Sequence, residues 1–487
     1  MEPSPSSAAF PIDDAIRASV MSKEMNSPRL LNSFFIYLGI LVTAVVAYLL
    51  IREYGEAQFG VTKIDVREIK ESHQALSSLF QVLVSLVVVI AVARLVGAVF
   101  RALHQPPVIG EVIGGILLGP SFLGAIAPGF MSAILPTASA PFLGIIAQLG
   151  IILYMFIVGL ELDLKLLRNS GHKTLMISHA SIVVPFLMGA VLAIWLFPSF
   201  APTGVGFTTF SLFLGVSLAI TAFPVLARIL TEKGLHKTPL GTLALTCAAI
   251  DDATAWCLLA FVTSVAQATI LSAVSTILLT IAYIFFMFLL VKPLAQKGVA
   301  ILEKSPRLSE GNLAIILLAL LVSALATEFI GIHAIFGAFL LGAITPHDSR
   351  VASELTERLQ DLVQVLFLPA FFAFTGMRTQ VGLVSSAEDW KTCAVIIAVA
   401  TFGKFFGTVA AARLCGVRWR ESGALGILMN TRGLVELIVL NIGLDLGVIS
   451  PRLFAMLVIM ALVTTFMTGP ALKIFIRDGQ APSTTSI

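Results

Sequence analysis

Apolar runs of about twenty residues recur along the chain, separated by short polar segments. A helix of that length crosses the hydrocarbon core of a bilayer. The alternating segments of about ten residues that a transmembrane β-barrel needs are not evident. The pattern therefore predicts an all-α polytopic membrane protein with spans at residues 33–51, 77–99, 106–125, 142–162, 175–198, 207–230, 240–267, 270–293, 312–329, 331–346, 361–378, 391–414, 421–445 and 452–476.

The polar flanks and the first span complete the predicted organisation. Residues 1–32 are expected to form a disordered cytoplasmic N-terminus, and 477–487 a short cytoplasmic tail. We interpret 33–51 as an extra transmembrane helix, with its loop reaching residue 76, rather than as a signal peptide, because a long polar stretch precedes it and no clean cleavage site follows. The main membrane domain is then 77–476.

Lysine and arginine are distributed unevenly between the two sides of the predicted spans. With the N-terminus in the cytoplasm, most of them fall in cytoplasmic segments. Because cytoplasmic loops carry an excess of these residues, the pattern predicts that both termini are cytoplasmic.

Short motifs repeat in the same order in the two halves of the chain. "VIGGILLGP" at 112–120 resembles "IFGAFLLGA" at 335–343, and the later motifs "TAFPVLARIL" and "NTRGLVELIV" also fall at matching places. An odd number of spans separates the two copies, so they face opposite ways. Inverted repeats of about 106–267 and 331–476 are typical of secondary transporters.

The composition gives no indication of nucleic-acid binding, of a metal site or of a cofactor. Charged residues make up 12% of the chain, against about 25% in soluble domains. The net charge of +3 is not gathered into a basic tract, so nothing indicates a nucleic-acid partner. No pair of the four cysteines has metal-ligand spacing, and we expect no cofactor.

Two neighbouring carboxylates interrupt one of the apolar runs. Asp251 and Asp252 lie in "AAIDDATAWC", inside span 240–267. One aspartate at the centre of a membrane helix costs about 2.5–3.5 kcal/mol, so an adjacent pair indicates a function. Consecutive helix positions point about 100° apart, so one carboxylate can face a cavity while the other meets a neighbouring helix. Such groups bind protons, and their oxygens also suit a transient Na⁺ or K⁺ ion.

A lysine inside another span is the matching counter-charge. Lys404 stands in "TFGKFFGT", where Gly403 and Gly407 allow close helix approach. A buried lysine needs a partner or loses its proton. We predict a functional pair with the aspartates; the alternative is an ion pair that only holds helices together.

Two spans carry helix-breaking residues at matching places. Pro224 lies late in span 207–230, and proline removes a helical hydrogen bond. "NTRGLVEL" lies early in span 421–445. Matched interruptions are the best sequence indication of a transporter binding site. The predicted ion- and proton-binding residues are Asp251, Asp252, Lys404 and Thr221, supported by Pro224, Asn430, Thr431 and Gly433.

Arg432 and Glu436 lie four residues apart on the second of these helices and could pair with each other. A structural role and a supporting role at the site are both open.

Six motifs, which follow one another along the chain in the expected order, resemble those of the monovalent cation:proton antiporter-2 family. That family includes bacterial sodium–proton antiporters, potassium efflux systems and plant cation/proton exchangers. The resemblance covers about residues 77–476. It rests on "QPPVIGEVIGGILLGPSFLG", "FIVGLELDL", "AITAFPVLARIL", "AAIDDATAWC", "FGKFFGT" and "NTRGLVELIVLNIG".

The resemblance implies a sodium–proton antiporter fold, usually homodimeric, in which a core domain with two crossed broken helices moves past a dimerisation domain. In family terms, Asp252 is the essential ion- and proton-binding carboxylate and Asp251 is the partner of Lys404. An aspartate pair goes with electrogenic exchange. Span 33–51 departs from the family pattern, and the absence of a nucleotide-sensing domain argues against gated potassium efflux.

The sequence thus predicts a secondary active transporter, not an enzyme, that exchanges Na⁺, or K⁺, for protons across a plasma membrane or bacterial inner membrane. Potassium–proton exchange in potassium efflux is one alternative. A sodium-coupled solute symporter, a cation channel and a non-transporting scaffold are the others.

Overall fold

The computed structural model describes residues 42, 43, 46, 66–161, 171–235, 238–266, 270–305 and 307–475, and the regular elements in these ranges are helices. The chain divides into two compact units, residues 1–76 and 77–487, and most of the described residues belong to the second. The predicted segments 1–32 and 477–487, and most of span 33–51, lie outside the described residues.

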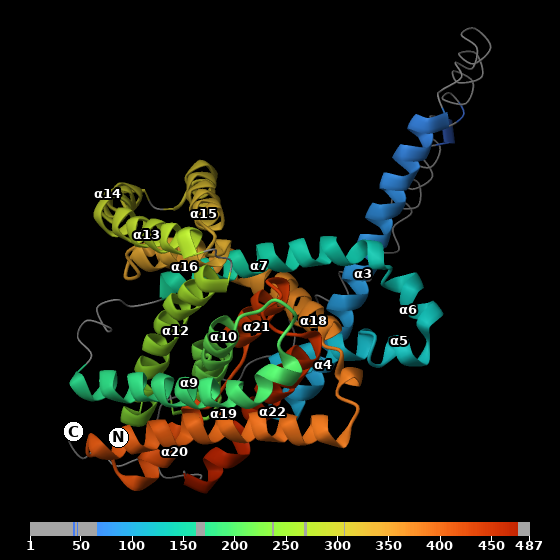
Figure 1. Cartoon of the computed structure of the whole chain (residues 1–487). Coiled ribbons are helices and arrows are strands. Elements are labelled where there is room, and N and C mark those ends of the chain that lie inside the picture. The colour runs from blue at the N-terminus through green and yellow to red at the C-terminus, as the bar shows by residue number, and fades with distance from the viewer. Residues whose placement is uncertain are drawn as a thin grey trace, which may run out of the picture. The chain divides into compact units, whose positions relative to one another are not determined.

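Short connections join the helices (Figure 1). The first half comprises α3 (Val66–Ala102), α4 (Pro107–Leu118), α5 (Leu123–Ile126), α6 (Pro128–Ile134), α7 (Ala140–Glu161), α9 (His172–Phe200), α10 (Phe207–Ala219), α11 (Phe223–Glu232) and α12 (Pro239–Ala266). The second half comprises α13 (Ile270–Phe286), α14 (Lys292–Leu302), α15 (Glu310–Ile330), α16 (Ala334–Ile344), α17 (Arg350–Leu362), α18 (Leu368–Arg378), α19 (Ala387–Leu414), α20 (Trp419–Met429), α21 (Leu434–Asp445) and α22 (Pro451–Phe475).

These helices agree with most of the predicted spans. Within the described ranges, ten helical stretches are long and apolar enough to cross a membrane, and the bent pair of α20 and α21 makes an eleventh. Each coincides with a predicted span. The predicted interruption of 207–230 is present as the break between α10 and α11, but it lies at residues 220–222, before Pro224. One span needs correction, because 331–346 holds the shorter helix α16.

Breaks in two helices define the centre of the fold. Between α10 and α11 the backbone is extended, with φ −71° and ψ 139° at Ile220. The break therefore precedes Pro224, which lies in the first turn of α11, where a missing N–H is tolerated. Between α20 and α21 the chain bends by 41°, and residues 430–433 leave the helical path.

Glycines let four helices cross at very short range. Gly115 of α4 and Gly376 of α18 face each other's helix so closely that an added Cβ atom would overlap a backbone carbonyl group. Gly159 of α7 and Gly342 of α16 meet in the same way. We call α4, α7, α16 and α18 the glycine-crossed helices. Because backbone lies directly on backbone, these crossings leave little freedom for one helix to slide on the other.

A second set of helices surrounds the two breaks: α9 to α12 and α19 to α22, here called the site helices. Within it, α9, α19 and α22 lie side by side (Figure 1). A Cβ atom on Gly403 of α19 would lie 2.9 Å from Pro185 Cα of α9, and one on Gly407 would lie 2.9 Å from the Ala180 carbonyl oxygen. This close approach brings Lys404, between the two glycines, against α9.

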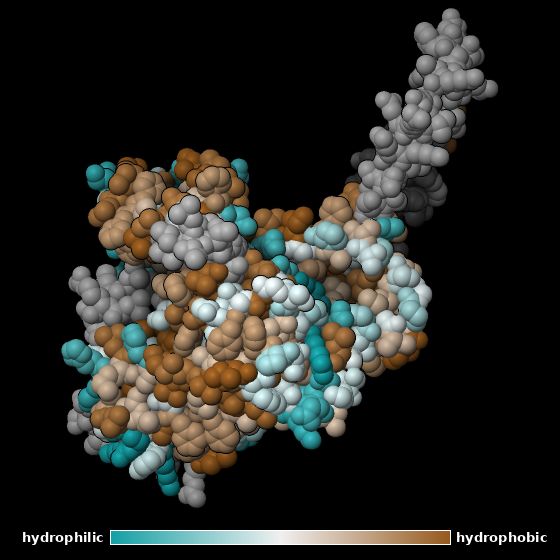
Figure 2. Space-filling model, viewed as in Figure 1, coloured by the Kyte–Doolittle hydropathy of each residue, from teal (hydrophilic) through white to brown (hydrophobic). Residues whose placement is uncertain are grey.

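Apolar side chains cover much of the outer surface. Figure 2 shows them over α13, α14 and α15, where Leu289, Leu325 and Phe329 are among the exposed residues. Of the most apolar 18-residue stretch in residues 278–302, which belongs to α13 and α14, only 11% is buried inside the protein. The corresponding share in α15 is 22%. Apolar surface of this extent needs an apolar surrounding, as expected for the helices of a multi-pass membrane protein.

The α4–α18 crossing predicts a sharp cost for a side chain at Gly376. We expect Gly376→Val to lower the free energy of unfolding by about 1–3 kcal/mol or more, because the added atoms have no space. The control is Gly129→Val in α6, where an added Cβ meets no heavy atom within 4 Å. Thermal unfolding of the detergent-purified protein measures both variants, and equal midpoints would contradict the prediction.

Candidate functional site

The two broken helices meet at their breaks. The Ala222 amide donates to the Thr431 carbonyl oxygen at 2.9 Å. The Thr221 hydroxyl lies 3.0 Å from the Met429 carbonyl oxygen, which it can reach as a donor. Backbone groups at a break have no partner within their own helix, and each break supplies hydrogen-bond partners for the other. A membrane interior requires such partners because no water is available there.

The second break is packed against α11 and braced by α22. A Cβ atom on Gly433 would lie 2.6 Å from Val225 Cγ2, so a side chain here would displace Val225. The Thr465 hydroxyl accepts from the Arg432 amide at 3.0 Å and donates to the Arg432 carbonyl oxygen at 2.6 Å. The predicted supporting residues Asn430 and Thr431 are buried in this segment. Pro224 lies in the first turn of α11.

Two buried cations cap the C-terminal end of α10. The Lys404 ammonium donates to the Ala219 carbonyl oxygen. The Arg432 guanidinium donates to the carbonyl oxygens of Ser217, at 2.8 Å, and Leu218, at 2.6 Å. The last carbonyls of a helix lack helical partners and carry partial negative charge. The two cations therefore stabilise a helix end that would otherwise be unsatisfied at membrane depth.

Asp251 is saturated with hydrogen-bond donors. Its Oδ1 accepts from the Ser178 hydroxyl at 2.6 Å. Its Oδ2 accepts from Ser181 at 2.7 Å, from Thr221 at 2.9 Å and from the Lys404 ammonium at 3.0 Å. Asp251 and Lys404 are both 0% exposed. An ionised carboxylate has about four acceptor positions, so four donors leave it little capacity for another ligand.

Two of these hydroxyls have a second acceptor within reach. The Ser181 oxygen lies 2.8 Å from the Ser178 carbonyl oxygen, and the Thr221 oxygen has the Met429 carbonyl described above. A hydroxyl carries one hydrogen, so each of them donates to one acceptor at a time.

Sequence reasoning missed Ser178 and Ser181. They lie three residues apart in "ISHASIVV" and therefore share one face of α9. That spacing is a usable signal, but serines in membrane helices also commonly bond to their own backbone. The contact with Asp251, 70 residues or more away in sequence, distinguishes these two.

Asp252 stands in contrast to its neighbour. It is 3% exposed, and neither carboxylate oxygen has a hydrogen-bond partner among the described residues. The Phe223 amide, at the start of α11, lies beside it without meeting hydrogen-bond geometry. The positive end of a helix favours a nearby anion. Asp252 is thus a carboxylate with both oxygens available for a ligand.

Arg432 and Glu436 form the second buried ion pair. Arg432 Nη1 donates to Glu436 Oε2 at 2.7 Å, and both side chains are fully buried. Arg432 also holds the end of α10, so the pair connects the two broken helices. The sequence left the role of this pair open, and the structure places it next to the site, between the two broken helices.

Most of the chain matches a known protein family. Residues 87–477 match the family model described as sodium/hydrogen exchanger, transmembrane. The Na(+)/H(+) antiporter NhaS4 of Synechocystis sp. is 45% identical over 396 residues, which cover 81% of this chain and 97% of that protein.

Eukaryotic relatives are longer than this chain. Cation/H(+) antiporter 17 of Arabidopsis thaliana is 41% identical over 402 residues, covering 81% of this chain and 48% of that protein. K(+)/H(+) antiporter 1 of Saccharomyces cerevisiae is 38% identical over 399 residues, covering 80% and 46%. The chain thus spans about half the length of these relatives.

A solved structure shares the fold. The sodium proton antiporter MjNhaP1 from Methanocaldococcus jannaschii aligns with a TM-score of 0.60 over 81% of this chain and 96% of that chain. The two sequences are 14% identical, so this likeness concerns the fold alone.

The Asp251 environment predicts the effect of removing its cation. Lys404→Met should lower the free energy of unfolding by about 3–5 kcal/mol, because it leaves a buried carboxylate without its counter-charge. The control is Lys391→Met on the same helix, where the lysine side chain is 73% exposed. Thermal unfolding with and without each change gives the comparison, and a Lys404 effect no larger than that of the control would contradict the prediction.

Proposed function

This chain belongs to the transmembrane sodium/hydrogen exchanger family, and on that basis we propose that it is a secondary active transporter that exchanges a monovalent cation for protons. It would do so by alternating access, with Na⁺ as the first expected cation and K⁺ as the second. The names of the relatives include both ions. The family is one of transporters, and the chain has their membrane helices.

The availability of Asp252 is the observation that carries this proposal. An isolated ionised carboxylate in a buried site is strongly disfavoured unless something neutralises it. Two neutralising partners are chemically suitable, a proton and a hard monovalent cation. They compete for the same two oxygens, and that competition is the minimum an exchanger needs.

The saturation of Asp251 refines the expected roles of the pair. A cation at Asp251 would have to displace a hydroxyl or the Lys404 ammonium, whereas one at Asp252 displaces no described hydrogen bond. We therefore assign the transported ion and proton to Asp252. Asp251 forms an ion pair with Lys404. If exchange is electrogenic, this ion pair would have to separate before Asp251 or Lys404 could carry a further proton.

The wider architecture is proposed on the same basis. The two glycine crossings pair helices from both predicted repeats in a reciprocal manner, as related halves would. They support the inverted repeats and a rigid group past which the site helices move. We propose a homodimer with cytoplasmic termini in a plasma membrane or bacterial inner membrane. The family supports the first point, and the lysine and arginine distribution supports the second.

Exchange in proteoliposomes tests the assignment. With Na⁺, Li⁺ or K⁺ outside, we expect cation-dependent proton movement against a proton gradient, and a dependence on clamped membrane voltage if exchange is electrogenic. Asp252→Asn should reduce this movement to the level of empty vesicles, because an amide neither releases a proton nor offers a negative charge.

The matched control is Glu388→Gln, which removes an acid whose side chain is 71% exposed and should retain parental rates. Full exchange in a correctly inserted Asp252→Asn protein would refute the role of Asp252. Proton flow that no cation gradient can drive uphill would indicate a channel instead.

A further inference from the structure

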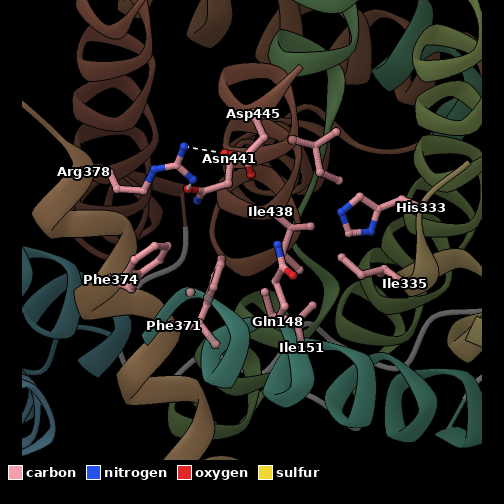
Figure 3. Close-up of a pocket in the computed structure, with 13 residues that line it drawn as sticks. Gln148, Ile151, His333, Ile335, Phe371, Phe374, Arg378, Ile438, Asn441 and Asp445 are labelled. Atoms are coloured by element: carbon pink, nitrogen blue, oxygen red, sulfur yellow. Dashed lines mark hydrogen bonds and ion pairs between the residues drawn. The ribbon is translucent and has the colours of Figure 1, made fainter. Parts of the chain in front are cut away.

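A second polar cluster joins the ends of α18 and α21 (Figure 3). The Arg378 guanidinium donates through Nη1 to Asn441 Oδ1 at 3.0 Å and through Nη2 to Asp445 Oδ1 at 2.5 Å. The Asn441 amide group donates to the Thr375 hydroxyl oxygen at 2.9 Å. Arg378 and Thr375 belong to a glycine-crossed helix, whereas Asn441 and Asp445 belong to a site helix. The cluster therefore connects the two sets of helices.

A small cavity lies directly beside this cluster. Its volume is about 30 Å³, and its lining includes Gln148, His333 and Ile438 as well as Arg378 and Asn441. Figure 3 shows these side chains converging on one space between α7, α18 and α21. A cavity of that size holds about one or two water molecules. At this end of the molecule, the space between the two helix sets is nearly closed.

The opposite end of α7 borders a much larger hollow. It has a volume of about 410 Å³, and its lining includes Glu161, His347 and Glu357. Gln148 and Glu161 are thirteen residues apart on α7, a rise of roughly 20 Å. The residues that line this hollow belong to α7, α17 and the connection before α17, and none belongs to a site helix, so it does not lie between the two helix sets.

The contacts that α18 makes on its two sides differ in kind. Towards α4, backbone lies on backbone at Gly115 and Gly376. Towards α21, the described link includes an ion pair in which the Arg378 side chain is 25% exposed and that of Asp445 is 48% exposed. Partly exposed ion pairs are weak and exchange easily with water. A rearrangement of α18 therefore occurs more readily at α21 than at α4.

The position of the cluster relative to the ion site gives it a role. α21 begins at the break beside Asp252, and Asn441 lies seven residues beyond Leu434, roughly 10 Å along the helix. We propose that Arg378, with Asn441 and Asp445, forms a latch that holds α21 against α18, closes the route to Asp252 at this end, and opens once in each exchange cycle. This inference rests on the exchange proposed above.

A reversible crosslink across the latch tests the proposal. Arg378→Cys and Asp445→Cys would be combined in a protein whose four native cysteines are replaced by alanine, and joined with a short bifunctional thiosulfonate reagent. We expect slower but measurable exchange in the reduced protein, because the ion pair of the latch is absent, loss of exchange to the level of empty vesicles after crosslinking, and recovery of the slower rate with reductant.

The control is the pair Ser121→Cys and Gln380→Cys, beside the Ser121 hydroxyl bond to the Thr379 carbonyl oxygen at 3.2 Å, where crosslinking should leave the rate unchanged. Verified crosslinking of residues 378 and 445 without inhibition would overturn the latch. Absence of exchange in the parent protein would instead overturn the proposed function.

A labelling measurement tests the same proposal without a crosslink. Ile438 lines the cavity and is 1% exposed, so Ile438→Cys should react slowly with a membrane-impermeant thiol reagent. Adding Arg378→Gln should increase the labelling rate several-fold, because the closed end then opens more often. Adding Lys391→Gln, at an exposed site, should not. Equal rates in the two backgrounds would count against the latch.

Discussion

The contact between Asp251 and Lys404 is the interaction on which the centre of this structure depends. It joins α12 to α19, and through the same ammonium it reaches α9 and the end of α10. A buried ion pair is tolerated when further hydrogen bonds satisfy the remaining lone pairs of the anion and the remaining protons of the cation. Here three hydroxyls complete the carboxylate, and two backbone carbonyls complete the ammonium. Removing one member would leave the others unsatisfied in a region that water does not supply.

The broken helices exist because the same groups make them possible. An unwound segment at membrane depth exposes carbonyl and amide groups that must find partners inside the protein. Lys404 and Arg432 supply donors for the end of α10, and the backbone contact at Ala222 and Thr431 joins the two breaks. With these demands met, Asp252 can remain without a hydrogen-bond partner among the described residues. Because the hydrogen bonds around the breaks involve other groups, the Asp252 carboxylate stays available for a ligand.

The sequence predicted what depends on composition and local spacing. Apolar length located the membrane helices, and isolated charges inside them singled out Asp251, Asp252 and Lys404. It predicted an interruption in span 207–230 but placed it at Pro224, because the break falls at residues 220–222, whose side chains are compatible with a helix. Ser178 and Ser181 escaped notice, and so did the link from Arg378 to Asp445, because these contacts depend on how distant helices pack. The spacing of the two serines is a weak local signal, but the identity of the partner in each contact cannot be read from one sequence.

The hydroxyl groups of Ser181 and Thr221 each have two acceptors within reach, which allows a fast motion inside the site. Each hydroxyl can turn from the Asp251 carboxylate to a backbone carbonyl at nearly the same distance and still keep one hydrogen bond. A redistribution of charge around Asp251 can therefore be absorbed by the rotation of two O–H bonds. Torsions of this kind are far faster than helix displacement, so the electrical response of the pocket can be complete before any backbone has shifted.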